Sequence, residues 1–150
     1  MRPHVIIYTD GGAAPNPGKG GWAAILYSPL HDKRREIYGS EENTTNNRME
    51  LMAAIKALEA LKTPCDVDLH TDSAYLQNAF VKRWLVKWQR NGWKNSSGSE
   101  VLNRDLWERL LELTKIHEVS WHWVKGHADN ELNNRCDELV RIAREEAGAN

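Results

Sequence analysis

The strongest constraint on the fold is the placement of four acidic residues beside apolar segments that lie far apart in the chain. Asp10 ends the strand-like run 5–9, and Asp72 ends a second run at 67–71. Glu50 begins the apolar stretch of an expected helix, and Asp137 lies near the start of another. Four converging carboxylates would repel one another, and the natural remedy is divalent metal.

The composition predicts a globular protein with one domain over residues 1–150. Apolar residues make up 41% of the chain and charged residues 27%, which is ordinary for a soluble fold. No apolar run reaches membrane-spanning length, and the first residues lead into a strand rather than a signal peptide. Cys65 and Cys136 lack disulfide or metal-site spacing, which indicates reduced thiols in a cytoplasmic protein. No feature points to an obligate protein partner, and a monomer is expected.

Basic residues are concentrated in one segment, although the net charge of the chain is only -1. Residues 74–99 contain no acid, and a local basic patch of this kind is typical of a polyanion site. Trp84, Trp88 and Trp93 are interleaved with the basic side chains. The four-residue spacing of Trp84 and Trp88 also suits a core-facing helix side, so at least one of them is expected in the core. The basic residues are Lys82, Arg83, Lys87, Arg90 and Lys94.

Periodicity and turn residues predict the element order β-β-β-α-β-α-α-β-α. Strands are expected at 5–10, 22–28, 34–39, 66–71 and 119–124. Helices are expected at 46–61, within 73–90 as one or two helices, at 102–113 and at 133–146. Residues 13–21 and 41–47 are expected to be loops, with Thr44 or Thr45 capping the first helix. This order predicts an α/β fold with a mixed sheet, helices on its faces and a site at strand ends.

The first expected helix turns Glu50 inward. At about 100° per residue, Glu50 shares a side with Ala54, Ala57 and Leu61 and points away from Glu59. A buried acid needs a partner. Two divalent ions about 3.5–4 Å apart, held by shared carboxylates, would provide one and would suit phosphodiester chemistry.

Further side chains suit work on a nucleic acid. His127 lies in a glycine-containing loop close to Asp137 and is a candidate proton shuttle. The amides of Asn16, Asn46 and Asn47 both donate and accept hydrogen bonds, which suits sugar and base edges in a minor groove, including the RNA 2′-OH.

Four short motifs surround the acidic residues. They are YTDGG at 8–12, TNNRMEL at 45–51, HTDSAY at 70–75, and VKGHA at 124–128 followed by NRCDEL at 134–139. Together, in this order and over essentially the whole chain, they resemble type 1 ribonuclease H, especially bacterial ribonuclease HI.

The resemblance implies a ribonuclease H-like fold, with a five-stranded mixed sheet whose first three strands are antiparallel, flanked by helices. It implies an endonuclease that hydrolyses the RNA strand of RNA–DNA hybrids with two Mg²⁺ ions, or Mn²⁺ in their place, and leaves 5′-phosphate and 3′-hydroxyl ends. By carry-over, Asp10 bridges both ions, Asp137 completes one, and Glu50 and Asp72 complete the other. His127 would assist proton transfer or product departure.

The resemblance also implies contacts with the hybrid. Asn16, Asn46 and Asn47 would read its minor groove, and Thr45 would contact a DNA phosphate. Residues 82–94 resemble the basic protrusion of the family, with Trp84 against the DNA strand. Two positions depart from the family pattern. Ala74 stands where Gln is frequent, so one contact to the RNA strand is expected to be absent, and Asp129 stands where glycine is common, which affects loop flexibility.

Each candidate also has a purely structural explanation. Asp10 precedes two glycines, as turn residues often do, and Asp72 stands where a helix cap is common. Glu50 and Asp137 lie near helix starts, where acids interact with the helix dipole. His127 could be an ordinary histidine of a surface loop. Two other functions also fit parts of the pattern: a non-catalytic nucleic-acid-binding domain, and an integrase-like or resolvase-like phosphodiesterase on the same fold. The intact acid set disfavours the first, and the basic segment with the asparagine pair disfavours the second.

Overall fold

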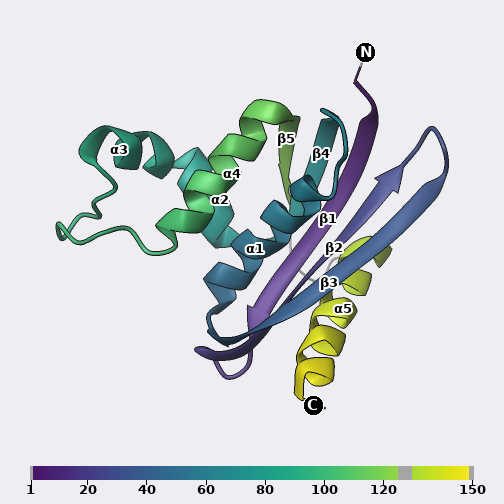
Figure 1. Cartoon of the computed structure of the whole chain (residues 1–150), viewed down its shortest axis with the longest axis horizontal. Helices are drawn as coiled ribbons and strands as arrows, with labels where there is room; N and C mark the ends of the chain where they lie inside the picture. The colour runs from purple at the N-terminus through teal and green to yellow at the C-terminus, as the bar shows by residue number, and fades with distance from the viewer. Residues whose placement is uncertain (1, 125–129, 149–150) are drawn as a thin grey trace.

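The protein is built around a central five-stranded sheet with helices on both faces (Figure 1). The computed structural model describes residues 2–124 and 130–148. The strands are β1 (His4–Ala13), β2 (Gly18–Ser28), β3 (Lys33–Thr44), β4 (Asp66–Thr71) and β5 (Glu118–Trp123). The helices are α1 (Asn46–Glu59), α2 (Ala74–Val81), α3 (Trp84–Asn91), α4 (Arg104–Ile116) and α5 (Glu131–Gly148).

The strands lie in the order β3-β2-β1-β4-β5. β2 pairs antiparallel with both β1 and β3, whereas β4 runs parallel to β1 and β5 runs parallel to β4. This arrangement confirms the mixed sheet with three antiparallel first strands. Because β4 is parallel to β1, the carboxyl ends of these two central strands lie at the same edge of the sheet.

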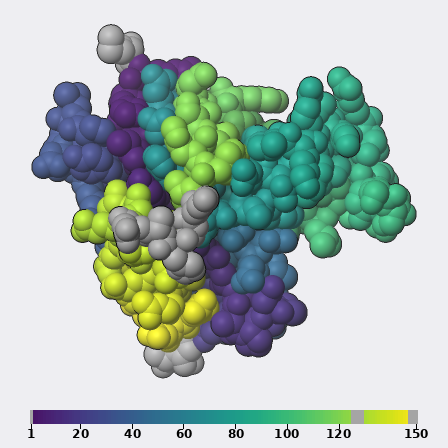
Figure 2. Space-filling view, turned by 180° about the vertical axis from the view of Figure 1, so that it is seen from behind, coloured from purple at the N-terminus to yellow at the C-terminus, as the bar shows by residue number. Residues whose placement is uncertain are grey.

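Two apolar layers hold the helices to the sheet. On one face, buried residues of α1, α2, α3 and α4 form a single cluster with β1, β2 and β4, and Trp107 of α4 is completely buried within it. On the other face, α5 packs alone through Cys136, Leu139 and Val140 against Ala23 and Ile25 of β2. Figure 2 shows α5 on this second face. Within the described residues, none of the helices is both long and apolar enough to cross a membrane.

The first three strands are longer than expected. Residues 18–21 and 41–44 were expected in loops and the first strand was expected to end at Asp10, but residues 11–12, 18–21 and 41–44 lie in the paired strands β1, β2 and β3. Cross-strand pairing overrides the low strand propensity of glycine here. Gly11 is also required sterically, because a Cβ at this position would overlap the backbone of Met49 in α1. The missing side chain therefore lets α1 approach β1 closely.

The helix boundaries follow local signals more closely. Thr45 caps α1, because its Oγ1 accepts a hydrogen bond of 3.2 Å from the backbone N–H of Arg48. Residues 73–90 form two helices, α2 and α3, because Arg83 between them adopts a left-handed conformation (φ 59°) that a helix does not continue through. α5 begins at Glu131, two residues earlier than expected.

The segment from α3 to the start of α4 projects from the side of the molecule in both views (Figures 1 and 2). Its tryptophans anchor it: Trp88 lies between Trp84, Trp93 and Trp107, with ring centroids 5.7–6.0 Å apart. Trp84 and Trp88 are both partly buried against the core, as their four-residue spacing predicted. The projection is therefore fixed by aromatic packing at its base.

Candidate active site and nucleic-acid interface

Asp10 and Asp72 are brought together by the register of β1 and β4. Tyr8 pairs with His70 across the two parallel strands, and each aspartate lies two residues further along the chain. Asp10 is within β1 and pairs with Ala23 of β2, so it is not a turn residue. Asp72 follows the last residue of β4. The two carboxyl groups therefore lie at the same edge and on the same side of the sheet.

Glu50 reaches this edge from α1. The helix passes over Gly11 with its backbone at residues 49 and 50 against the strand, which places Glu50 beside Asp10. The Glu50 carboxylate accepts a hydrogen bond of 2.6 Å from the hydroxyl of Ser73. Ser73 also caps α2, since its Oγ accepts from the N–H of Leu76 at 3.1 Å. Because Ser73 supplies the cap, Asp72 is not needed for that purpose.

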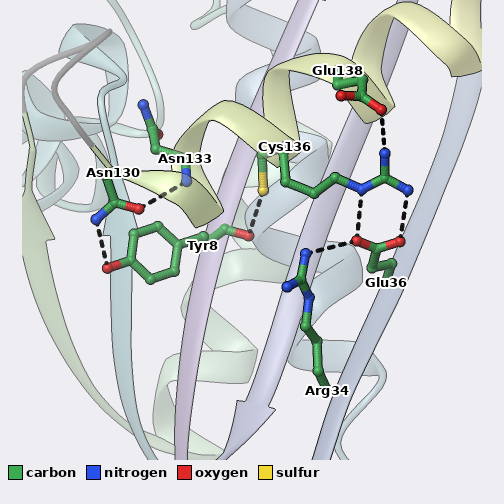
Figure 3. Close-up of polar contacts among 8 residues, drawn as sticks. Tyr8, Arg34, Glu36, Asn130, Asn133, Cys136 and Glu138 are labelled. Carbon is green, nitrogen blue, oxygen red and sulfur yellow. Dashed lines mark hydrogen bonds and ion pairs between the residues drawn. The ribbon is translucent and has the colours of Figure 1, made fainter.

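Asp137 comes from the opposite face of the sheet, on α5. The neighbouring Cys136 is fully buried, and its thiol donates to the backbone carbonyl of Tyr8 at 3.3 Å (Figure 3). Asp137 itself is exposed. It lies six residues after the start of α5. The helix dipole acts most strongly within the first turn, and Asp137 lies beyond that turn. A helix-dipole role therefore does not explain it.

The other three carboxyl groups lie close enough to Asp10 to affect its pKa, and the four are called the acidic cluster. The pKa of Asp10 is raised from 3.8 to about 7, mainly by burial and also by the negative charges of Asp72, Asp137 and Glu50, while a hydrogen bond from Gly11 opposes the rise. The pKa of Glu50 is raised from 4.5 to about 7, mainly by burial and also by the charge of Asp72, while the Ser73 hydrogen bond opposes the rise. Mutual repulsion of this kind is relieved by a proton or by a cation.

The donor chemistry of this cluster fits a hard divalent cation. All four groups are carboxylates, the ligand type that Mg²⁺ and Mn²⁺ prefer over thiol or imidazole. Among residues 2–124 and 130–148, however, no three His, Cys, Asp or Glu side chains are arranged to hold an ion as they stand. The hydrogen bond to Ser73 is one contact that sets the direction of the Glu50 carboxylate. The four groups lie near one another but do not form a complete set of ligands around one point.

The predicted asparagines gather in one hollow, and one of them, Asn46, lies about one helical turn before Glu50 on α1. The cavity of ≈ 490 Å³ is lined by side chains from the 14–17 loop, α1, α2, α3 and the segment before α4, among them Asn16, Thr45, Asn46, Asn47, Trp84 and Asn103. The side-chain oxygen of Asn46 accepts from the N–H of Ala13 at 2.7 Å, and that of Asn16 accepts from the N–H of Asn46 at 3.1 Å. Since both oxygens are used inside the protein, the amide NH₂ groups are the donors left for a ligand.

Asn103 was not identified from the sequence. It precedes α4, has a left-handed backbone (φ 60°), and its side-chain oxygen accepts from Arg48 of α1 at 3.4 Å. An asparagine before an amphipathic helix is a recognisable capping signal. Its place beside Asn16 and Thr45 depends on the packing of α4 against α1, which no local pattern reveals.

The five basic residues lie in and around α3. Lys82, Arg83, Lys87, Arg90 and Lys94 are all exposed, and none of them forms an ion pair with another described residue. A second hollow of ≈ 410 Å³ contains Lys87 and Lys94 together with Trp84 and Trp88. Trp84 lines both hollows, so the basic segment and the asparagine hollow adjoin. His127 and Asp129 lie outside the described residues.

Comparisons with known proteins identify the family of this chain. Residues 2–145 match the model of the family described as RNase H. A ribonuclease H from Prosthecochloris aestuarii is 59% identical over 143 residues, which cover 95% of this chain and 97% of that protein. A ribonuclease H from Acetivibrio thermocellus is 58% identical over 136 residues, covering 91% of each chain.

Solved structures show the same architecture. The crystal structure of LC9-RNase H1, a type 1 RNase H with the type 2 active-site motif, superposes with a TM-score of 0.84 at 30% identity, covering 97% of this chain and 74% of that one. LC11-RNase H1, solved in complex with an RNA/DNA hybrid, has a TM-score of 0.68 at 25% identity, covering 95% of this chain and 98% of that one.

Proposed function

This chain belongs to the RNase H family, and from that membership we propose that it is an endonuclease that hydrolyses the RNA strand of RNA–DNA hybrids and leaves 5′-phosphate and 3′-hydroxyl ends. The observation that carries the proposal is the cluster of Asp72, Asp137 and Glu50 around Asp10. The cluster lies beside a hollow lined with asparagine. The RNA/DNA hybrid bound by LC11-RNase H1 supports the choice of substrate.

The four carboxylates would hold two Mg²⁺ ions, or Mn²⁺ in their place. Asp10 would contact both ions because it lies at the centre of the cluster, where all three other acids raise its pKa. Asp137 would complete one ion, and Glu50 with Asp72 the other. When bound, such a pair of ions lowers the pKa of a water and neutralises charge on the scissile phosphate.

The remaining residues would bind and orient the hybrid. The amide NH₂ groups of Asn16 and Asn46 point to recognition of acceptors, such as the base and sugar oxygens of a minor groove. Thr45 would contact a phosphate of the DNA strand, and Asn47 is exposed beside it. Trp84 offers an apolar surface to a sugar or base at the junction of the two hollows. His127 would move a proton during hydrolysis or aid departure of the product.

The basic segment would supply affinity for the phosphate backbone. Phosphate contacts position a nucleic acid and carry no sequence information, which suits an enzyme that recognises a type of duplex. These contacts come from Lys82, Arg83, Lys87, Arg90 and Lys94.

The proposal is tested by offering matched RNA–DNA, RNA–RNA and DNA–DNA duplexes with Mg²⁺ or with a chelator, followed by analysis of the product ends. We expect cleavage of the RNA strand of the hybrid alone, only with Mg²⁺. Binding of the hybrid without cleavage in Mg²⁺ or Mn²⁺ would instead indicate a non-catalytic nucleic-acid-binding domain. Cleavage of DNA–DNA duplexes would indicate an integrase-like or resolvase-like enzyme.

A further inference from the structure

Tyr8 connects three elements that carry the acidic cluster. It lies on β1 two residues before Asp10, so the two side chains share a face of the sheet. Its phenolic oxygen accepts a hydrogen bond of 3.1 Å from Nδ2 of Asn130, and its backbone carbonyl accepts from the thiol of Cys136 at 3.3 Å (Figure 3). Its ring stacks on His70 of β4, with centroids 4.4 Å apart and planes 7° apart.

Two contacts of Tyr8 lie close in sequence to acids of the cluster. Cys136 immediately precedes Asp137 on α5, and His70 precedes Asp72 by two residues on β4. Tyr8 therefore touches the segments of Asp72 and Asp137 and lies on the same strand as Asp10. The strand register explains why β1 and β4 stay aligned, but among the described residues no backbone pairing fixes α5 against the sheet.

The placement of α5 depends on directional contacts. The helix packs on β2 through apolar side chains, and apolar burial is non-directional, so it resists separation better than sliding. Arg135 directs the helix towards β3 through two hydrogen bonds to Glu36 of 2.8 and 3.0 Å, and Asn130 directs the beginning of the helix towards β1. Its Oδ1 accepts from the N–H of Asn133 at 2.9 Å and caps α5, while its Nδ2 donates to Tyr8. The same side-chain amide thus caps the N-terminus of α5 and bonds it to β1.

We propose that the hydrogen bond between Asn130 and Tyr8 sets the position of Asp137 relative to Asp10, which makes Tyr8 and Asn130 positioning residues for the hydrolysis. The inference rests on the proposed function. Loss of the bond lets the first turns of α5 shift, which weakens the joint binding of cations by the two acids. No described residue of α5 lines the hybrid-binding hollow, so affinity for the substrate is not affected.

The test replaces Tyr8 by Phe, which keeps the ring, its stacking on His70 and the backbone carbonyl but removes the hydroxyl. The matched control is Tyr38→Phe, because the Tyr38 hydroxyl donates to Glu146 at the other end of α5 at 3.2 Å. For Tyr8→Phe we expect a decrease of about fivefold in Mg²⁺ affinity, measured by calorimetry without substrate, as for the loss of one hydrogen bond. kcat falls at limiting Mg²⁺, whereas KM for the hybrid does not change. Tyr38→Phe behaves as the wild type in all three measurements.

A second variant removes the same hydrogen bond from its other side, which separates its loss from a folding defect of Tyr8→Phe. Asn130→Ser keeps a capping side chain for α5, but serine is too short to reach Tyr8. It should reproduce the effect of Tyr8→Phe, and the double variant should be no worse than either single one, because both remove the same bond.

The outcomes separate this inference from the proposed function. If the wild type fails to cleave the hybrid while Tyr8→Phe still loses Mg²⁺ affinity, the positioning role holds and the proposed activity is wrong. If the wild type cleaves and Tyr8→Phe matches it in Mg²⁺ affinity and kcat, the positioning role is wrong. Equal losses in Tyr8→Phe and Tyr38→Phe would also overturn it, since they would indicate general loosening of α5.

Discussion

Replacing Asp10 by Asn should make the protein more stable when divalent metal is removed. The pKa of Asp10 in the folded protein is about 7, against an ordinary value of 3.8. A group with a raised pKa stabilises the fold while it is protonated, and this contribution is lost as the pH rises from the ordinary value through about 7. Above that range, the ionised Asp10 is buried among like charges, whereas Asn carries no charge.

The magnitude follows from the size of the rise. Roughly three pKa units at about 1.36 kcal/mol each give about 4 kcal/mol as an upper bound. We expect a gain of about 2–4 kcal/mol in the free energy of unfolding at about pH 8, falling towards zero at about pH 4, where the wild-type carboxyl is protonated as well.

The assay is urea unfolding in chelator at both pH values. Asp66→Asn is the matched control, because Asp66 is an exposed aspartate at the start of β4, and it should change stability little at either pH. Saturating Mg²⁺ should stabilise the wild type and not Asp10→Asn, since a ligand stabilises only the state that binds it. A loss of stability in Asp10→Asn at about pH 8, in chelator, would refute the reasoning.

Three further predictions concern other parts of the molecule. The first neutralises four basic side chains of the α3 segment, Lys82, Arg83, Lys87 and Arg90. This change should weaken hybrid binding and reduce the slope of log K against log salt by about 0.9 per lost phosphate contact. An unchanged slope would place the binding surface elsewhere. His127→Ala should slow turnover without loss of metal binding, and equal turnover at every pH would exclude a proton role. Glu36→Gln should cost up to about 1 kcal/mol at neutral pH, because hydrogen bonds from Arg135 and then Arg34 lower the pKa of Glu36 (Figure 3). A lowered pKa means that ionised Glu36 stabilises the fold at pH values above its ordinary pKa of 4.5, and that this stabilisation is lost as the pH falls. If Glu36→Gln still destabilised the protein in acid, the ion pairs of Glu36 would not be the cause.

Local sequence signals predicted the elements but not their full extent. Apolar runs ending in Asp10 and Asp72 indicated the central strands, because apolar β-branched residues favour buried strands. The first strand was expected to end at Asp10, just before Gly11. Its place inside β1 depends on pairing with Trp22 and on the close approach of Met49, and neither contact can be inferred from neighbouring residues.

The site also has residues that local sequence reveals and residues that depend on remote contacts. The four acids and the asparagine pair were identified because they lie in recognisable motifs. Asn103, Tyr8 and Asn130 were missed because each acts through a partner remote in sequence, and the Tyr8–Asn130 hydrogen bond spans 122 positions. Ser73 was recognised as part of a helix start, but its second contact, to Glu50, appears only once α1 and α2 are packed together.

The central claim is that acids from four distant segments act as one metal-dependent hydrolytic site. The most direct test measures, for the wild type and Asp10→Asn, both the rate of hybrid cleavage in Mg²⁺ and the affinity for the hybrid in chelator. We expect Asp10→Asn to lose at least about a hundredfold in rate, as when a major electrostatic stabiliser is removed, while it binds the hybrid at least as tightly as the wild type. Cleavage by Asp10→Asn at the wild-type rate would contradict the account.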